Sequence, residues 1–268
     1  MSSLTTDTLA ETKRALSERP AATAEPAGQP AWHLSPELRQ QLLEALMAPP
    51  MTEARLRMSY EDFLAWADED TLAEWVDGEV VMTSPASNRH QDLVSFLDNL
   101  LRPYVEQHKL GIVRTAPFQV KLEHGREPDL IFLSLARMER LKGNRVEGPP
   151  DLVIEIVSAE SVGRDRGEKF YEYARGGVPE YWLIDPQARW AEFYRLAGDY
   201  YRPAFTGDQG IYRSEAVSGF WLQVEWLWQE PLPPVEDALL EIGGEAYARR
   251  WIARLREHGF LPPEPEGA

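Results

Sequence analysis

The sequence predicts a mixed α/β domain, an α+β arrangement in which helices are placed among the strands of a mixed sheet. Two observations predict this class. Segments with apolar residues at helical spacing alternate along the chain with short apolar runs typical of strands. The 268 residues are 43% hydrophobic and 27% charged, an ordinary globular composition with enough chain to bury a real core. We expect this domain over 58–228.

Proline separates the domain from two flanking segments. The tail at 1–57 is rich in Pro, Ala, Thr, Ser and Glu and can bury little apolar surface. It contains one candidate short helix, Pro36–Met47, which would dock on the domain or on a partner. The segment 229–268 begins with a proline-rich linker, continues as an amphipathic helix over Val235–His258, and ends in acidic residues and prolines.

Three helices are expected inside the domain. The first has about ten residues and follows Ser59, a good N-cap residue. The second, Asn88–Gln107, is long and amphipathic, and Pro103 is expected to kink or divide it. The third runs from about Gly163 to Arg175 and stops at a pair of glycines.

The strands are predicted by turn residues and short apolar runs. Asp77-Gly78 between two apolar arms is a strong hairpin signal. Leu152–Val157 is apolar except for Glu155, which indicates a strand buried on both faces. The other expected strands are Gly111–Thr115, Phe118–Leu122, Asp129–Leu133, Glu180–Ile184, Ala191–Arg195, Tyr200–Ala204, Ile211–Ser214 and Leu222–Val224.

Composition excludes several kinds of site. The chain has no cysteine, so it has no disulfide, no thiolate metal site and no cysteine nucleophile. It has no apolar run long enough to span a membrane and no secretory signal, so a cytoplasmic protein is expected. The formal charge of −16 argues against a broad nucleic-acid-binding surface, because affinity for DNA comes mainly from Lys and Arg. Any contact with DNA would need a local basic patch or a bound cation.

Two carboxylates lie in predicted strands. Asp129 follows Pro128 at the start of one apolar strand, and Glu155 lies in the middle of another. A buried carboxylate costs several kcal/mol unless it is paired, protonated or bound to a cation. Two such groups on neighbouring strands would favour a hard divalent cation, Mg²⁺ or Mn²⁺. The alternative is that Asp129 caps a turn and Glu155 pairs with an arginine.

The spacing of these acids resembles a nuclease signature. Pro128-Asp129, followed by 25 residues and then Glu155, resembles the PD-(D/E)XK pattern. The stretches AEWVDGEVVMTSPASNRH, APFQVKL, REPDLIFL and PPDLVIEIVSAESVGRDRGEKFYEYARGGVPEYWLID resemble the Uma-two family of restriction-type endonucleases, over roughly 58–200. This resemblance implies a restriction-endonuclease-like core, a mixed sheet flanked by helices, with the site at one end.

The resemblance also implies roles for individual residues. Asp129 and Glu155 match the family's metal-binding acids. The lysine expected two residues after the glutamate is replaced by Val157, so Lys169 in the following helix is the candidate catalytic lysine; the alternative is a surface salt bridge with Asp165. Further matches are auxiliary: Glu74 and His90 would complete the metal shell or act as general base, although a lone histidine there is commonly a cap or core residue.

Three arginines are candidates for phosphate contacts despite the acidic total, namely Arg89, Arg164 and Arg166, and the alternative is a solvated helix face. The function expected is a Mg²⁺- or Mn²⁺-dependent endonuclease that hydrolyses DNA phosphodiester bonds. The first alternative is a catalytically inactive member of the fold, acting as a nucleic-acid-binding or protein-interaction module. The second is a hydrolase of small phosphoesters. A homodimer is plausible, because cutting both strands requires two sites.

Overall fold

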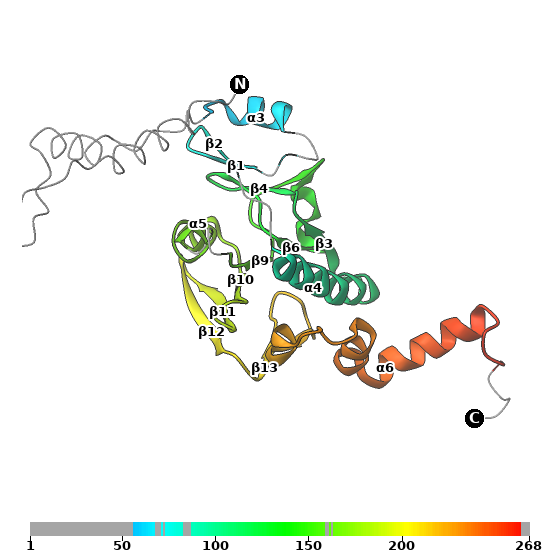
Figure 1. Cartoon of the computed structure of the whole chain (residues 1–268). Coiled ribbons are helices and arrows are strands. Elements are labelled where there is room, and N and C mark those ends of the chain that lie inside the picture. The colour runs from blue at the N-terminus through cyan, green and yellow to red at the C-terminus, as the bar shows by residue number, and fades with distance from the viewer. Residues whose placement is uncertain are drawn as a thin grey trace, which may run out of the picture. The chain divides into compact units, whose positions relative to one another are not determined.

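A six-stranded mixed sheet forms the centre of the domain (Figure 1). The computed structural model describes residues 56–67, 71, 73–82, 87–158, 161 and 163–263, so the helix expected over Pro36–Met47 lies outside the described residues. The strand order is β12-β11-β10-β9-β6-β3, and only β9 and β10 run parallel. The strands are β3 (Gly111–Thr115), β6 (Leu130–Ser134), β9 (Leu152–Ile156), β10 (Glu180–Asp185), β11 (Trp190–Ala197) and β12 (Tyr200–Gly207).

The two faces of this sheet carry different helices (Figure 1). Alternate residues such as Leu130, Ile154 and Trp182 pack with α4 (Asn88–Gln107). Their neighbours, such as Ile131 and Val153, pack with α5 (Lys169–Gly176) on the other face. Every residue of β9 is buried, which confirms the expectation for this strand. Both faces of the sheet are therefore covered, and a charged side chain on β9 cannot reach bulk water.

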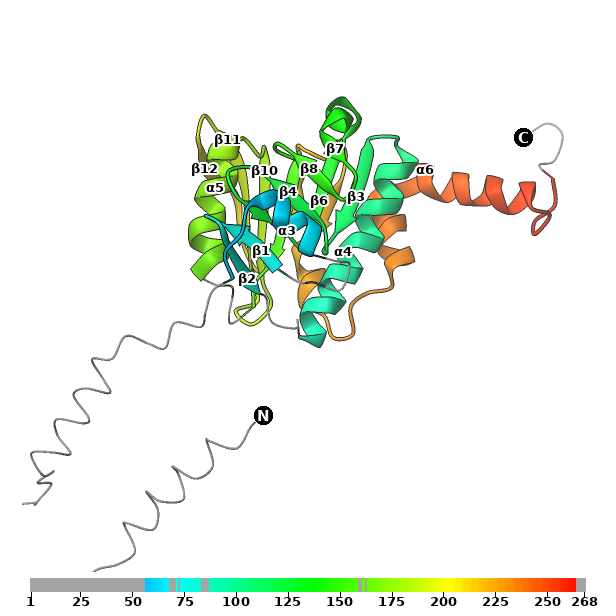
Figure 2. The ribbon, with the colours of Figure 1, turned by 90° about the horizontal axis from the view of Figure 1, so that it is seen from above.

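A second six-stranded sheet of very short strands covers one end of the first, with α3 (Tyr60–Trp66) packed on it (Figure 2). The predicted hairpin at Asp77-Gly78 joins its first two strands, and both residues have positive φ, as a tight turn of this kind requires. The strands are β1 (Ala73–Val76), β2 (Glu79–Met82), β4 (Gln119–Lys121), β5 (Gly125–Arg126), β7 (Leu141–Lys142) and β8 (Arg145–Glu147). β1 and β5 bring charged side chains toward α5.

The helices differ from the prediction in two places. The helix α4 is one continuous helix, so the expected division at Pro103 is wrong. Proline removes a single backbone hydrogen bond, and buried side chains fix the helix on both sides of that residue, Leu100 and Leu101 before it and Tyr104 and Val105 after it. The predicted third helix begins instead with a π-helical turn, η2 (Arg164–Glu168), in which the Lys169 N–H donates to the Arg164 carbonyl.

The C-terminal part of the domain packs on the α4 face. It contains the hairpin of β13 (Ile211–Arg213) and β14 (Trp221–Gln223), the 3₁₀-helix η3 (Val224–Trp228) and α6 (Val235–Glu257). A second 3₁₀-helix, η1 (Leu135–Arg140), follows β6. The first half of α6 is buried against α4 through Ala238, Leu239 and Ile242. Within the ranges that the structure describes, none of the helices combines the length and apolar character needed to cross a membrane.

Candidate active site

Asp129 and Glu155 lie side by side on the α5 face of the main sheet. Leu130 pairs with Ile154 in the antiparallel β6–β9 ladder, so one step further places Asp129 opposite Glu155. The Ile156 N–H donates to Asp129 Oδ2 at 2.7 Å, which extends the ladder through a side chain. The structure thus brings the two predicted acids to the same face at the same level of the sheet.

Lys169 reaches this pair from the start of α5. Its Nζ lies 3.0 Å from Glu155 Oε1, 3.0 Å from Glu74 Oε1 and 3.4 Å from Asp165 Oδ1. The ion pair with Asp165 exists, but it is not at the surface, because Asp165 is 1% exposed and Lys169 is 6% exposed. Val157 points into the core of the α5 face. The ammonium beside Glu155 is therefore supplied by the helix.

Glu74 is held in place by a buried arginine. Glu74 lies on β1 and accepts a hydrogen bond from Arg126 Nη1 at 3.2 Å. The Nε of the same guanidinium donates to Glu172 Oε2 at 2.7 Å, and Glu172 also accepts from the His124 N–H. Burial opposes ionisation of Glu74, but Lys169 and Arg126 outweigh it and lower the pKa of this carboxyl. Glu74 therefore stays ionised.

His90 approaches from the opposite side, in the first turn of α4. The hydroxyl of Ser87 caps this helix and accepts from the His90 N–H. His90 Nε2 lies 3.2 Å from Asp129 Oδ2. Burial alone would lower the pKa of His90, but the bond to Asp129 and its negative charge raise it above the ordinary value. His90 is therefore set to hold a proton and to share it with Asp129.

Three residues of the cluster were not predicted as site residues: Arg126, Asp165 and Tyr173. Asp165 is buried on the π-helical turn, and neither of its carboxylate oxygens accepts a hydrogen bond of good geometry from a described residue. The Tyr173 hydroxyl donates to Glu155 Oε1 at 2.8 Å. The spacing Asp165, Lys169, Tyr173 was the available signal, because residues at i, i+4 and i+8 share one side of a helix.

The cluster has more negative than positive charge. Burial raises the pKa of Glu155 well above its ordinary value; Lys169 opposes this, and the charges of Asp165 and Asp129 add to it. Burial likewise raises the pKa of Asp165. Burial would lower the pKa of Lys169, but Glu155, Glu74 and Asp165 raise it well above its ordinary value. Lys169 thus stays charged, but its single positive charge is shared by Glu74, Glu155 and Asp165.

Comparison with known proteins places this geometry in a family. A family model described as "Uma2: Putative restriction endonuclease" matches residues 60–225. The chain belongs to the Uma2 family. A crystal structure from Anabaena variabilis ATCC 29413, described as "a putative nuclease belonging to DUF820", is similar to this chain at 18% sequence identity with a TM-score of 0.56. The similarity covers 64% of this chain and 97% of that one, and it supports the fold. No curated protein matches the sequence.

The donor set of this Uma2 chain fits a hard divalent cation. Its oxygen donors are carboxylates. The Asp165 oxygens are buried, accept no hydrogen bond of good geometry from a described residue and share the ammonium of Lys169 with two other acids, so a further cation would stabilise them. In the part of the chain that the structure describes, no three His, Asp or Glu side chains are spaced to hold a metal by themselves. Mg²⁺ commonly keeps several waters and takes only one or two carboxylates, so two acids such as Asp129 and Glu155 would be enough protein ligands for it.

The three arginines predicted to face phosphate have different environments. The guanidinium of Arg89 donates to the backbone carbonyls of Leu227 and Gln229, so it joins α4 to η3. Arg166 pairs with Asp185 and Glu192. Arg164 is half-buried, and its Nε has no hydrogen-bond partner among the described residues. The structure does not gather them into one patch of unpaired guanidinium groups.

Proposed function

We propose that this Uma2 chain is a metal-dependent endonuclease that hydrolyses DNA phosphodiester bonds. The observation that carries the proposal is the position of Lys169 Nζ, 3.0 Å from Glu155 Oε1, with Asp129 opposite Glu155 on the neighbouring strand. Two carboxylates with an adjacent ammonium are the groups that metal-assisted hydrolysis of a phosphodiester requires. Family membership supports a nuclease-like activity.

Asp129 and Glu155 would hold Mg²⁺ or Mn²⁺. When bound, the ion lowers the pKa of a water molecule and polarises the scissile phosphate. Glu74 is held by Arg126 and keeps a negative charge next to Lys169, so its role is to orient the ammonium. His90 keeps a proton on the Asp129 side and fixes the carboxylate for binding.

Lys169 would act directly on the reacting groups. Its ammonium is buried among carboxylates, which keeps it protonated, and it emerges from a helix rather than from the strand. A charged donor at this place orients the attacking water and stabilises the negative charge that develops on the phosphate oxygens. Of the three predicted arginines, Arg164 is the one left to contact a phosphate, because Arg89 and Arg166 are engaged by carbonyls and carboxylates.

The test is cleavage of supercoiled DNA with Mg²⁺ or Mn²⁺. Asp129→Ala is expected to abolish cleavage while thermal unfolding stays cooperative. Asp98→Ala serves as the matched control, because Asp98 only forms a partly exposed ion pair with Arg102 on α4. Equal cleavage by wild type and Asp129→Ala would show that the mechanism is wrong. Parallel reactions with RNA and nucleotides test the small-phosphoester alternative.

One observation favours a second candidate, a non-catalytic binding module of the same fold. The Lys169 ammonium lies between Glu74, Glu155 and Asp165 and partly neutralises them without a metal. Calorimetric titration with Mn²⁺ separates the two candidates. An endonuclease is expected to show binding that Glu155→Ala removes, whereas a non-catalytic module is expected to show no carboxylate-dependent heat.

A further inference from the structure

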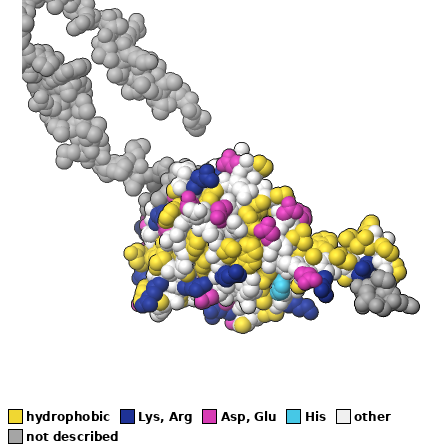
Figure 3. All heavy atoms as spheres, turned by 90° about the horizontal axis from the view of Figure 1, so that it is seen from below, with side chains coloured by type: hydrophobic (Ala, Val, Ile, Leu, Met, Phe, Trp, Pro, Cys, Tyr) yellow, Lys and Arg dark blue, Asp and Glu magenta, His cyan; other side chains and the backbone are white. Residues whose placement is uncertain are grey.

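The second half of α6 carries an exposed apolar face. Gly244 has non-helical angles (φ 54°, ψ −147°), so α6 consists of two helical stretches, and the second leads away from the sheets (Figures 1 and 2). We name residues 245–261 the C-terminal arm. Trp251 is 44% exposed, Ile252 40% and Phe260 76%. Figure 3 shows hydrophobic side chains over this projecting end. Apolar surface of this kind indicates a binding surface.

The C-terminal arm is basic on an acidic protein. It contains four arginines, Arg249, Arg250, Arg254 and Arg256, against Glu245 and Glu257, a formal charge of +2. The whole chain carries −16, so the rest of the chain carries −18. The arginines lie mainly on the side of the helix opposite Trp251 and Leu255, and Arg254 also stacks on Trp251 at 5.4 Å. The arm is therefore amphipathic and cationic.

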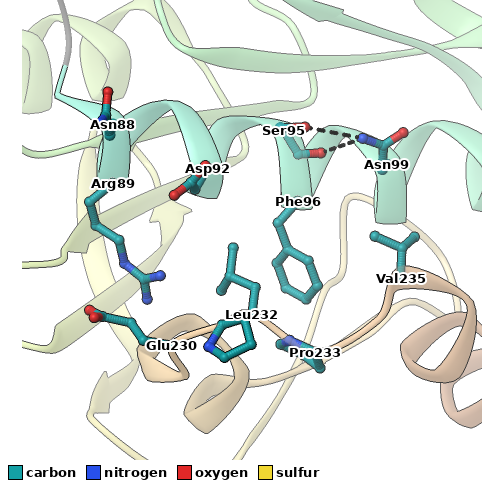
Figure 4. Close-up of a pocket in the computed structure, with 11 residues that line it drawn as sticks. Asn88, Arg89, Asp92, Ser95, Phe96, Asn99, Glu230, Leu232, Pro233 and Val235 are labelled. Atoms are coloured by element: carbon teal, nitrogen blue, oxygen red, sulfur yellow. Dashed lines mark hydrogen bonds between the residues drawn. The ribbon is translucent and has the colours of Figure 1, made fainter.

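A groove with complementary chemistry lies at the root of α6. It is a cavity of about 650 Å³ between α4 and the segment 230–235 (Figure 4). We name it the α4 groove. Its apolar surface is formed by Phe96, Leu232 and Val235. Its acidic rim is formed by Asp92 and Glu230.

The one arginine that lines the α4 groove offsets only part of its acidic rim. Arg89 donates to the carbonyls of Leu227 and Gln229, which fixes its guanidinium but leaves its charge, so Asp92, Glu230 and Arg89 together give the groove a formal charge of −1. The volume of the groove exceeds that of an indole ring several times, so it has room for Trp251 with part of its helix. The groove thus offers apolar contact and two carboxylates to an incoming amphipathic, basic helix.

We propose that the C-terminal arm of one copy binds the α4 groove of a second copy, and that the exchange is reciprocal in a homodimer. Apolar residues of the arm would meet Phe96, Leu232 and Val235, and its arginines would meet Asp92 and Glu230. Each copy offers both surfaces, so a twofold axis closes the assembly with both arms bound. This association does not depend on the proposed nuclease activity.

Two observations favour a second copy over DNA as the occupant. The arm follows the part of α6 that packs on the α4 face, whereas Asp129 and Glu155 lie on the α5 face. DNA held at the carboxylates would therefore not lie along the arm. DNA would also leave the apolar residues of the arm in water. The arm lies beyond residue 225, where the family match ends, so it is an addition to the family's core.

The experiment is sedimentation of the full-length chain over a range of concentrations. Wild type is expected to be a dimer, and Trp251→Glu is expected to raise the dissociation constant at least tenfold. Trp190→Glu is the matched control, because Trp190 is similarly exposed (40%) but lies on β11. The double charge reversal Asp92→Arg with Glu230→Arg is expected to weaken the dimer to a similar extent.

Mixing the variants identifies the surfaces. Trp251→Glu keeps an intact groove, and the Asp92→Arg, Glu230→Arg variant keeps an intact arm, so the mixture is expected to form a heterodimer with one arm bound. A wild-type monomer at about 100 µM would overturn the proposal, because even a weak dimer is populated there. A groove variant that dimerises like wild type would also overturn it, because that result indicates arm-to-arm pairing. A monomeric wild type whose arm variants lose only affinity for DNA would overturn it in favour of DNA as the occupant.

Discussion

Two buried glutamates on neighbouring strands have opposite environments. Glu155 on β9 and Glu180 on β10 are both almost inaccessible to solvent, but they lie on opposite faces of the main sheet. Glu180 accepts hydrogen bonds from Trp182 Nε1 and from the N–H groups of Glu215 and Ala216. Glu155 instead lies among Lys169, Tyr173 and further carboxylates. One is a structural acceptor, and the other is part of a charged cluster.

The difference teaches that burial of a carboxylate in a strand does not by itself indicate a functional site. Neutral donors satisfy Glu180 completely, so nothing remains for a ligand to supply. At Glu155 the surrounding carboxylates outnumber the cations, so the cluster gains from a further positive charge. The chemical nature of the groups around each carboxylate separates the two cases.

The largest expected effect is on cleavage by Glu155→Gln. This change keeps the shape of the side chain and removes its charge, so cleavage is expected to fall by about 10³-fold. Folding is expected to persist, because Lys169 retains Glu74 and Asp165 as partners. Initial rates on DNA and a thermal melt measure the two quantities. Activity within a few-fold of wild type would place Glu155 in the same structural class as Glu180.

Lys169→Met is expected to have the largest effect on stability. It leaves Glu74, Glu155 and Asp165 buried without their common cation, which costs about 3–5 kcal/mol of the free energy of unfolding. Mn²⁺ is expected to raise the melting temperature of this variant more than that of wild type, because the ion replaces the lost charge. An equal response of both proteins to Mn²⁺ would contradict a cation-accepting cluster.

Glu180→Gln is expected to lower the free energy of unfolding by about 2 kcal/mol, because an amide cannot accept all three of the present hydrogen bonds. Mn²⁺ binding and cleavage are expected to be unchanged at temperatures where the variant is folded. Urea denaturation and calorimetry check the two parts. Loss of Mn²⁺ binding in the folded variant would remove the distinction between the two glutamates.

Glu127 gives the smallest and most specific effect, a dependence on pH. Burial, reinforced by the charge of Glu74, raises the pKa of Glu127 to about 7. The folded protein therefore holds a proton that the unfolded chain releases near pH 4.5, so stability is lost as pH rises from about 4.5 through 7. Glu127→Gln removes this loss of unfolding free energy. The loss is at most about 3 kcal/mol, and it is smaller here because Glu127 is partly exposed to solvent.

Denaturation at pH 5 and pH 8.5 measures this prediction. Wild type and Glu127→Gln are expected to differ little at pH 5, where Glu127 is neutral in the folded protein and the loss of stability has only begun. At pH 8.5 the variant is expected to be the more stable protein. A variant that is less stable than wild type at pH 8.5 would show that the negative charge of Glu127 is compensated in the folded state.

The order of elements and the pair of acids were predictable from sequence. Periodicity and turn residues located the hairpin at Asp77-Gly78, the long helix α4 and the buried strand β9. Three strands of the second sheet, β5, β7 and β8, were missed, since segments of two or three residues show no period. Lys169 as a candidate came from the family resemblance. Arg126 gave no local signal, because its partners Glu74 and Glu172 are about fifty residues away in the chain.

The π-helical turn at Arg164–Glu168 makes the position of the lysine depend on a single residue. A π-helical turn contains one more residue than an α-helical turn. Deleting Gly167, which has no neighbouring atoms where a side chain would begin, would convert the segment to regular α-helix and rotate Asp165 by about 100° relative to Lys169. Every acid and the lysine would still be present in such a chain, yet the ammonium and its partner carboxylate would face different directions. A homologue one residue shorter here would keep the signature without the site.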